Sequence, residues 1–338
     1  MSEPSVAVVV PNFNGEGILG ACLAAVAAQT SPPARVIVVD NASADGSLVL
    51  LARDWPDVEV VACAENHGFA GGVNRGVEAA AGCSLVAVLN SDARPHADWL
   101  ERLLAAPRPD DVWAWGSVLV RPRDAAAPPT AAAPPGVAAP PGDDIVESAG
   151  DCWDVRGFAY KAARGAALSA LPAEPFEVFA PPGASPLLRR DVVVALGGYD
   201  ERFFLYYEDL DLAFRARLAG LRALLVPDAL VEHDLGGSGD LDRTRFHVAR
   251  NSIACNVMNA PDLHPRALLH GLRHDWAAAR RDGYVRAHLR GRRAALARLP
   301  GSLRERRRRQ AARVAPVADV ERAYDLPPAI AHLGPRWP

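Results

Sequence analysis

Short apolar runs and helical stripes alternate through the first ninety residues, and this alternation restricts the possible folds more than any other feature of the chain. Apolar runs typical of strands buried on both faces occupy 6–10, 36–39, 58–62 and 85–89. Between them, apolar residues recur at helical spacing, as in 18–26 and 73–80. This order predicts an α/β fold, a mostly parallel sheet with flanking helices.

Polar residues lie at the carboxyl ends of several of these predicted strands. Asn12, Asp40 and the run Asn90 to Asp92 all stand at or just after a carboxyl end. Ligands of such sheets gather at that edge, so we expect a binding site there. Ser43 or Asp45 is expected to cap the following helix, whose apolar side is predicted from three residues: Leu48, Leu51 and Ala52.

The second half of the chain is less regular. Residues 121–144 are rich in proline and alanine and are expected to form a surface insertion without chemistry. After it the sequence predicts further elements: a strand at 176–180, a helix at 189–196 closed by Gly197-Gly198, a helix from Glu208 to a cap at Gly220, and two short strands, 223–226 and 229–231, around Pro227.

Composition excludes several classes of protein. The net charge of −3 gives no general attraction for nucleic acid. Five cysteines without a C-x-x-C pair indicate free thiols in a reducing cytoplasm. The N-terminus shows no leader pattern, and no apolar run approaches the roughly 18 residues of a spanning helix. We therefore expect a soluble or peripheral protein.

The C-terminal region has a different character. Between 264 and 313, fifteen arginines face three acids, with leucines and alanines between them. This pattern predicts amphipathic helices, so we divide the chain into a catalytic domain, 1–260, and a helical basic extension, 261–338. The extension is interpreted either as a solvated appendage or oligomer contact, or as a surface that lies on an anionic membrane.

Three acidic or imidazole positions are candidates for chemistry. Asp92 is placed to hold a divalent cation on a diphosphate, although an Asx-turn would also use it. The pair Glu208-Asp209 opens a helix, where acids are favoured by the helix dipole and where one can also serve as a base. His233 closes a strand and suits Mn²⁺ or Mg²⁺ as a second ligand, or is a structural histidine. Asp211 is expected to be structural.

A glycine-rich segment, E-N-H-G-F-A-G-G-V-N-R-G from Glu65, enters the third predicted helix. Glycines there permit close approach of a ligand, and backbone N–H groups at a helix start favour phosphate. The segment does not have the G-x-G-x-x-G spacing and follows the third strand, not the first. A dinucleotide-binding site is therefore disfavoured.

Taken in order, these motifs resemble the family 2 inverting glycosyltransferases of the GT-A fold, especially their rhamnosyltransferase-like branch. The resemblance runs over about residues 5–260, through V-A-V-V-V-P-N-F-N, V-I-V-V-D-N-A-S-A-D-G-S, the glycine-rich segment, L-N-S-D-A, F-F-L-Y-Y-E-D-L-D-L-A-F-R and V-P-D-A-L-V-E-H. It implies a Rossmann-like nucleotide-diphospho-sugar transferase sheet. The Pro/Ala-rich insertion has no counterpart in it.

The resemblance also assigns roles to individual residues. Asp209 would be the catalytic base, with Glu208 beside it, and Asp92 and His233 would hold Mg²⁺ or Mn²⁺. Asn90 stands where the family's metal motif has its first carboxylate. The nucleotide-sugar pocket would be formed by ten residues: Pro11, Asn12, Asn14, Asp40, Asn41, Asn66, Gly68, Asn74, Asn90 and Ser91.

The implied activity is inverting transfer of a sugar from dTDP-rhamnose or a UDP-sugar to an acceptor hydroxyl, in bacterial surface polysaccharide or glycoconjugate synthesis. The acceptor would be a glycan, a lipid-linked sugar or a small molecule. A nucleotidyltransferase is the first alternative, but the segment after the first strand, P-N-F-N-G-E-G, lacks the basic residue that it needs. A non-catalytic nucleotide-sugar-binding protein is the second.

Overall fold

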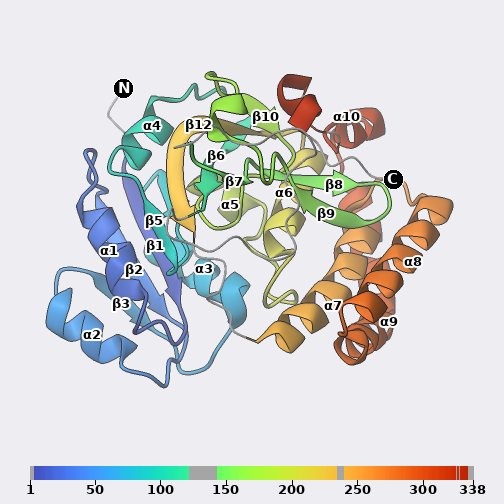
Figure 1. The fold of residues 1–338 in the computed structure, drawn as a ribbon, viewed down its shortest axis with the longest axis horizontal. Coiled ribbons are helices and arrows are strands. Elements are labelled where there is room, and N and C mark those ends of the chain that lie inside the picture. The colour runs from blue at the N-terminus through green and yellow to red at the C-terminus, as the bar shows by residue number, and fades with distance from the viewer. Residues whose placement is uncertain (1–3, 122–142, 234–239, 325, 327, 334–338) are drawn as a thin grey trace.

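A computed structural model describes residues 4–121, 143–233, 240–324, 326 and 328–333. It contains a central sheet with helices on both faces, and long helices from the C-terminal part of the chain run along one side of the molecule (Figure 1). Of the predicted insertion, 122–142 lie outside the described residues, so that prediction stays untested.

The main sheet has ten strands in the described residues, with β10-β12-β6-β11-β4-β1-β2-β3 as its main path. Its first four strands pair in parallel, as predicted: β1 (Val6–Asn12), β2 (Arg35–Asp40), β3 (Glu59–Ala62) and β4 (Leu85–Val88). The remaining strands of this sheet are β5 (Ala93–Pro95), β6 (Val112–Val120), β7 (Val146–Ser148), β10 (Phe176–Val178), β11 (Leu187–Arg189) and β12 (Arg222–His233).

Two hydrophobic layers cover the sheet. One contains side chains of α1 (Leu19–Ala27), α2 (Ser47–Asp54) and α4 (Trp99–Ala105). The other contains side chains of α3 (Gly68–Ala79), α5 (Arg190–Ala195) and α6 (Glu208–Leu218). Successive residues of β1 alternate between them, since Val8 belongs to the first layer and Val9 to the second. The predicted α/β sandwich is therefore confirmed.

Three local predictions are wrong. Gly46, and neither Ser43 nor Asp45, occupies the N-cap position of α2, which begins at Ser47. Asp45 still accepts from the Ser47 N–H at 3.0 Å, whereas Ser43 accepts from the Asn14 N–H at 2.8 Å. Of the apolar side predicted for α2, only Leu51 is buried. The strands predicted on either side of Pro227 form one strand, β12, with a register shift against β6 between Val226 and Leu230. A bulge there accommodates the missing proline N–H without ending the strand.

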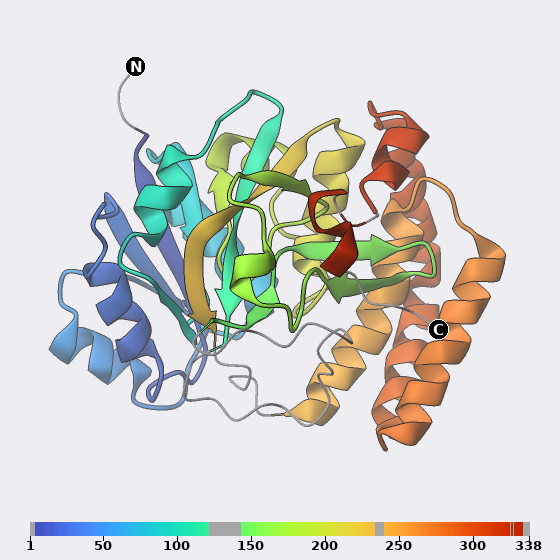
Figure 2. The same cartoon turned by 45° about the horizontal axis from the view of Figure 1, so that its top comes forward.

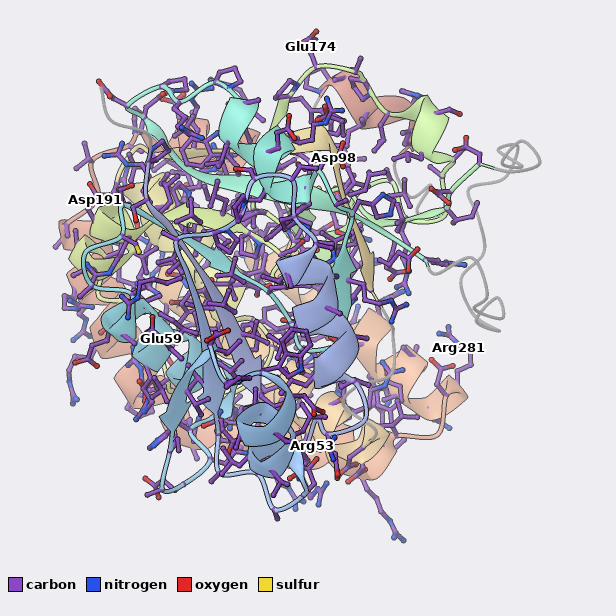
Figure 3. All side chains as sticks on the ribbon, turned by 90° about the vertical axis from the view of Figure 1, so that its left-hand side faces the viewer. Arg53, Glu59, Asp98, Glu174, Asp191 and Arg281 are labelled. Atoms are coloured by element: carbon purple, nitrogen blue, oxygen red, sulfur yellow. The ribbon has the colours of Figure 1, made fainter. Side chains whose placement is uncertain are left out.

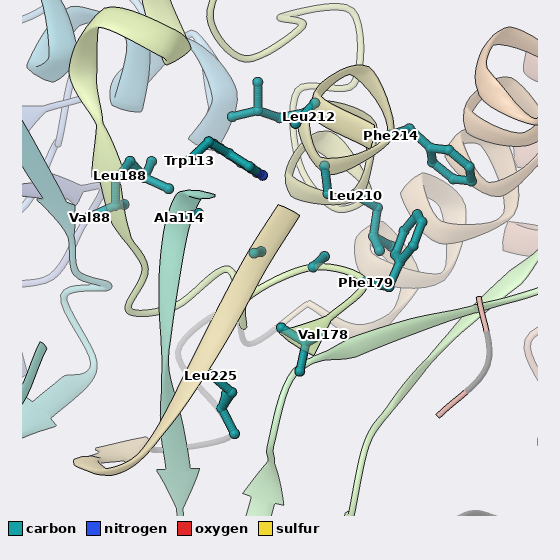
Figure 4. Packing of buried hydrophobic residues seen from close by; sticks show 14 of the residues in the cluster. Val88, Trp113, Ala114, Val178, Phe179, Leu188, Leu210, Leu212, Phe214 and Leu225 are labelled. Carbon is teal, nitrogen blue, oxygen red and sulfur yellow. The ribbon is translucent and has the colours of Figure 1, made fainter. Parts of the chain in front are cut away.

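Helix α6 is anchored by aromatic packing. Phe214 meets Phe179 edge-to-face, with ring centroids 4.8 Å apart. Figure 4 shows Leu210 and Phe214 close to Phe179 and Val178. Each buried side chain of this size contributes about 1.5–3 kcal/mol. The first turn of α6, which carries the acidic pair, is therefore attached to a rigid part of the core.

The C-terminal helices α8 (Pro265–Arg281), α9 (Val285–Ala311) and α10 (Val317–Arg322) follow α7 (Leu241–Asn259), against which α9 packs. Arg309 of α9 is buried and forms ion pairs with Asp200 and Asp211. Asp211 also accepts from Arg215 and Asn259, which confirms its structural role. The basic region is thus tied to α6 through a buried charge network.

A small second sheet, the hairpin of β8 (Asp151–Asp154) and β9 (Phe158–Lys161), lies between the main sheet and the C-terminal helices (Figure 2). Charged side chains such as Arg53, Glu59 and Asp191 lie on the outside of the molecule (Figure 3). All five cysteines are free, as predicted. No helix in the described part of the chain is long and apolar enough to span a bilayer.

Candidate active site

Asp40 is held by two donors at the carboxyl end of β2. Asn12, opposite it on β1, donates from Nδ2 to Asp40 Oδ1 at 3.0 Å. The Ser43 N–H donates to the other carboxylate oxygen, also at 3.0 Å. Asp40 and Asn12 are both almost fully buried. The carboxylate therefore has one fixed orientation at the sheet edge.

Asn41 ties this strand end to the start of α3. Its Nδ2 donates to the Gly68 carbonyl at 2.7 Å, and its Oδ1 accepts from the His67 N–H at 3.0 Å. Asn66 Oδ1 accepts from the Gly68 N–H at 2.8 Å. Gly68 has φ +72°, and a Cβ there would stand 2.2 Å from the Phe204 carbonyl oxygen. Only glycine fits where this turn meets the loop before α6.

The other residues assigned to the nucleotide-sugar pocket have varied surroundings. Pro11 lies buried in β1. Asn14 Oδ1 accepts from the Ala44 N–H at 2.8 Å, which joins two loops of this edge. Asn74 Oδ1 accepts from the Tyr199 N–H at 2.7 Å, and Asn74 Nδ2 donates to the Tyr199 carbonyl at 2.8 Å. Its amide groups therefore brace α3 against the segment after α5.

The predicted metal residues meet at the end of β4. Ala93, directly after Asp92, pairs with His233 of β12. His233 Nε2 lies 3.3 Å from Asp92 Oδ1 and 3.4 Å from Asn90 Nδ2. His233 Nδ1 and Asn90 Oδ1 are buried without a hydrogen-bond partner among the described residues. Ser91, between Asn90 and Asp92 in sequence, is half-buried.

These groups fit a divalent cation that also binds a diphosphate. A carboxylate, an imidazole and an amide oxygen are suitable ligands for Mn²⁺ or Mg²⁺. No cluster of three or more His, Cys, Asp or Glu side chains suited to a metal occurs in the described residues. The protein would thus contribute few ligands, and the phosphate oxygens would supply the others.

The loop before α6 is strained. Phe204, Tyr206 and Tyr207 have φ values of +66°, +67° and +73°, which non-glycine residues rarely adopt. Asn251 of α7 donates to the carbonyl groups of Phe203, Leu205 and Tyr206 at 3.0, 2.8 and 2.7 Å. Its neighbour Arg250 also donates to the Phe203 carbonyl. These bonds hold the backbone of residues 203–207, which directly precedes the acidic pair. We call this segment the base loop.

Asp209 lies across a short segment from the metal residues. A Cβ on Gly183 would come within 2.3 Å of Asp209 Oδ2. The next carbonyl, of Ala184, accepts from the Asn90 N–H at 2.9 Å. The 183–184 segment therefore contacts both the acidic pair and the end of β4.

Burial and neighbouring charge alter both members of the acidic pair. Burial, followed by the negative charge of Asp151, raises the pKa of Asp209 from 3.8 to about 6. Burial and the charge of Asp209 raise the pKa of Glu208 well above its usual range. Glu208 is 4% exposed, whereas Asp209 is only half-buried. Asp209 is therefore the member that a substrate can reach, with a pKa suited to accepting a proton near neutrality.

Sequence reasoning missed two groups around Asp209. Asp151 and Lys161 face each other on the β8–β9 hairpin, with Nζ 3.5 Å from Oδ1. The positive charge of Lys161 lowers the pKa of Asp209 and so opposes Asp151. Lys161 is the only lysine of the chain, which was a visible signal. The loop contacts of Arg250 and Asn251 had no comparable signal.

Strand direction brings the remaining candidates to one edge. β1, β2 and β4 are parallel, so Asn12, Asp40 and the Asn90–Asp92 run follow neighbouring carboxyl ends. β12 is parallel to β6, which reaches β4 through the antiparallel β11, so His233 ends at the same edge. Acid, amide and imidazole groups from four strands therefore share one side of the sheet.

Comparison with known proteins agrees with this arrangement. Residues 7–127 match the model of glycosyl transferase family 2. The chain is 27% identical over 233 residues to the N-acetylglucosaminyl-diphospho-decaprenol L-rhamnosyltransferase of Mycobacterium tuberculosis (strain CDC 1551 / Oshkosh), covering 62% of this chain and 70% of the relative. These matches support a family 2 glycosyltransferase of the rhamnosyltransferase-like type.

Two further similarities concern this glycosyltransferase. It is 26% identical to the O-antigen biosynthesis protein RfbC of Myxococcus xanthus, over 68% of this chain and 17% of the relative. The mannosyltransferase PcManGT from Pyrobaculum calidifontis, solved with GDP-Man and Mn²⁺, superposes with a TM-score of 0.52 at 19% identity, over 96% of this chain and 88% of the other. The second similarity supports the GT-A fold.

Proposed function

We propose that this glycosyltransferase moves a sugar from a nucleoside-diphosphate sugar to an acceptor hydroxyl in the synthesis of a cell-surface glycan. The observation that carries the proposal is the Asp92–His233 pair, 3.3 Å apart at the sheet edge and linked to Asp209 through Gly183 and Ala184. The named activities of the mycobacterial and Myxococcus relatives support the surface-glycan role. We propose dTDP-rhamnose as the donor, with UDP-sugars as the competing class.

The proposed chemistry is a single displacement. Asp209 accepts the proton of the acceptor hydroxyl as its oxygen forms a bond to the anomeric carbon of the donor. The bond from that carbon to the diphosphate breaks, and its electron pair leaves with the nucleotide. Because attack and departure occur on opposite faces, the anomeric configuration inverts. Glu208 is almost fully buried beside the base, so the acceptor hydroxyl would meet Asp209 and not Glu208.

Donor binding is assigned to the polar edge of the sheet. Asp40 would accept from the ring N–H of a uracil or thymine, with Asn12 and Asn41 fixing its surroundings. Asn66 and Gly68 would border the ribose or phosphate. The other assigned pocket residues, which line or brace the same edge, are Pro11, Asn14, Asn74, Asn90 and Ser91.

Asp92 and His233 would hold a divalent cation, with Asn90 beside them. The cation would neutralise charge on the diphosphate when bound. Manganese in the solved mannosyltransferase complex supports this cofactor class. Asn90 Oδ1 has no hydrogen-bond partner in the described part of the chain, which leaves acceptor capacity for the ion or its water shell.

We also propose that residues 1–260 form the catalytic domain and that 261–338 are an extension that contacts the inner face of the cytoplasmic membrane. Exposed Leu289, Leu296 and Leu303 recur every seven residues along α9, among arginines. Apolar and cationic side chains on one helix suit an anionic lipid surface. Sedimentation with vesicles containing anionic lipid should carry the protein down, and sedimentation equal to that with neutral vesicles would reject this contact.

The transfer proposal is tested with purified protein, Mn²⁺ or Mg²⁺, a panel of dTDP-, UDP- and GDP-sugars, and lipid-linked or free glycan acceptors. We expect metal-dependent release of one nucleoside diphosphate coupled to glycosylation of an acceptor. Nucleotide binding without transfer to any acceptor would favour the non-catalytic binding protein. Absence of both would reject the proposal.

A further inference from the structure

A cavity of about 430 Å³ lies between α7, α9 and the base loop, away from the sheet edge that carries the predicted donor site. Its apolar wall includes Phe203, Met258 and Ala295. Its polar groups include the guanidinium groups of Arg202, Arg250 and Arg298. No catalytic or donor-binding role assigned above uses this cavity.

The arginines of the cavity are not equivalent. Arg202 forms an ion pair with Asp200. In the described part of the chain, neither Arg250 nor Arg298 has a carboxylate within 4.0 Å. Arg250 donates instead to the backbone carbonyls of residues 202 and 203, and Arg298 to that of residue 202. Two cations therefore face a largely apolar cavity without a neutralising acid.

Electrostatics agrees with this unbalanced charge. Burial and the positive charge of Arg298 lower the pKa of Arg250 to about 10. Burial, followed by the charges of Arg250, Arg243 and Arg298, lowers the pKa of His247 to about 4. An anion placed between Arg250 and Arg298, which both line the cavity, would relieve the repulsion between these two charges.

We propose that this cavity binds a phosphate-bearing amphiphile, with its phosphate or diphosphate group on Arg250 and Arg298 and its apolar chain along Met258 and Ala295. Charge complementarity selects the anionic head, and the apolar wall selects the chain. The occupant would touch Arg250, which supports the base loop through the Phe203 carbonyl. The inference concerns binding and does not depend on which sugar is transferred.

The test uses farnesyl diphosphate as probe, titrated calorimetrically into the full chain in EDTA, with inorganic diphosphate and farnesol as separate arms. We expect farnesyl diphosphate to bind at least about tenfold more tightly than either arm. If inorganic diphosphate binds as tightly as farnesyl diphosphate, the apolar chain adds nothing and the proposal of an amphiphile is overturned. If farnesol binds as tightly, the phosphate group adds nothing and the proposal of an anion site is overturned. No binding of farnesyl diphosphate would overturn the whole inference.

Variants locate the probe. Arg298→Gln and Ala297→Glu alter exposed residues of the cavity wall and should each weaken binding about tenfold with unchanged circular dichroism. Arg293→Gln, an exposed arginine of the same helix outside the cavity, should leave affinity within about twofold. Unchanged affinity in both cavity variants would overturn the inference. Loss of binding in Asp92→Asn would also overturn it, because the probe would then occupy the donor site.

Discussion

At the donor edge, Asp40 accepts hydrogen bonds from Asn12 and Ser43 and lies between regular strands. At the base loop, Glu208 and Asp209 follow three residues with left-handed backbone. Burial and the charge of Asp209 raise the pKa of Glu208, whereas burial and the charge of Asp151 raise the pKa of Asp209. In the first region, hydrogen bonds to both carboxylate oxygens fix the orientation of Asp40. The second is held in an unfavourable state by the surrounding structure, as expected where a proton must move.

This comparison separates recognition from chemistry. Substitutions at the two regions should therefore affect different measured quantities: donor affinity at one, and turnover or its pH dependence at the other.

Asp209→Asn should reduce kcat about 10²–10⁴-fold, because the amide cannot accept the acceptor proton. Donor affinity, measured by calorimetry, should stay within about threefold. Asp57→Asn, at an exposed acid, serves as the control and should change neither quantity. A fully active Asp209→Asn enzyme would remove this residue from the base role.

Asp92→Asn should weaken activation by Mn²⁺ about 10–100-fold, since one anionic ligand is lost. His233→Ala should act in the same direction. Asn90→Asp provides the opposite test, because an added carboxylate beside His233 should lower the Mn²⁺ concentration needed for half-maximal activity. Activity that is independent of metal in all three variants would contradict the cation site.

Asn251→Leu should lower kcat about tenfold with little change in donor affinity, since three carbonyl groups of the base loop lose their donor. Asn256→Leu is the matched control on the same helix, because Asn256 makes no bond to this loop among the described residues. Equal losses in both variants would indicate general destabilisation. Partial recovery in Asn251→Gln would support positioning.

Asp151→Asn and Lys161→Met should move the acid limb of the activity profile in opposite directions, by about 0.5–1 pH unit. Removing the Asp151 charge lowers the pKa of Asp209, so activity should persist to lower pH. Removing the Lys161 charge raises that pKa, so activity should fall earlier on acidification. Shifts of the same sign in pH–rate profiles would show that the pair does not act through charge.

The two regions also differ in how well their structure could be predicted from the sequence. The donor edge was predictable because Asn12, Asp40 and Asp92 each follow an apolar strand run, and parallel strands bring such positions together. The start of α2 at Ser47 was not predictable, because Ser43 bonds the distant Asn14 and Asp45 bonds the distant Glu16 as well as Ser47.

The surroundings of Asp209 were even harder to predict from the sequence. The position of Asp209 was indicated by its helix, but its raised pKa depends on Asp151, which lies on a separate hairpin. The support of the base loop comes from Asn251, 45 residues from Tyr206. Neither contact has a local sequence pattern, since both arise from tertiary packing.

The central claim is that Asp209 is the base and that burial and Asp151 raise its pKa to about 6. The most direct test is the pH dependence of kcat/KM for the unaltered enzyme. Because the base must be ionised, activity should be constant above about pH 7 and fall tenfold per unit below about pH 6. A profile that remains flat down to about pH 4 would contradict the account.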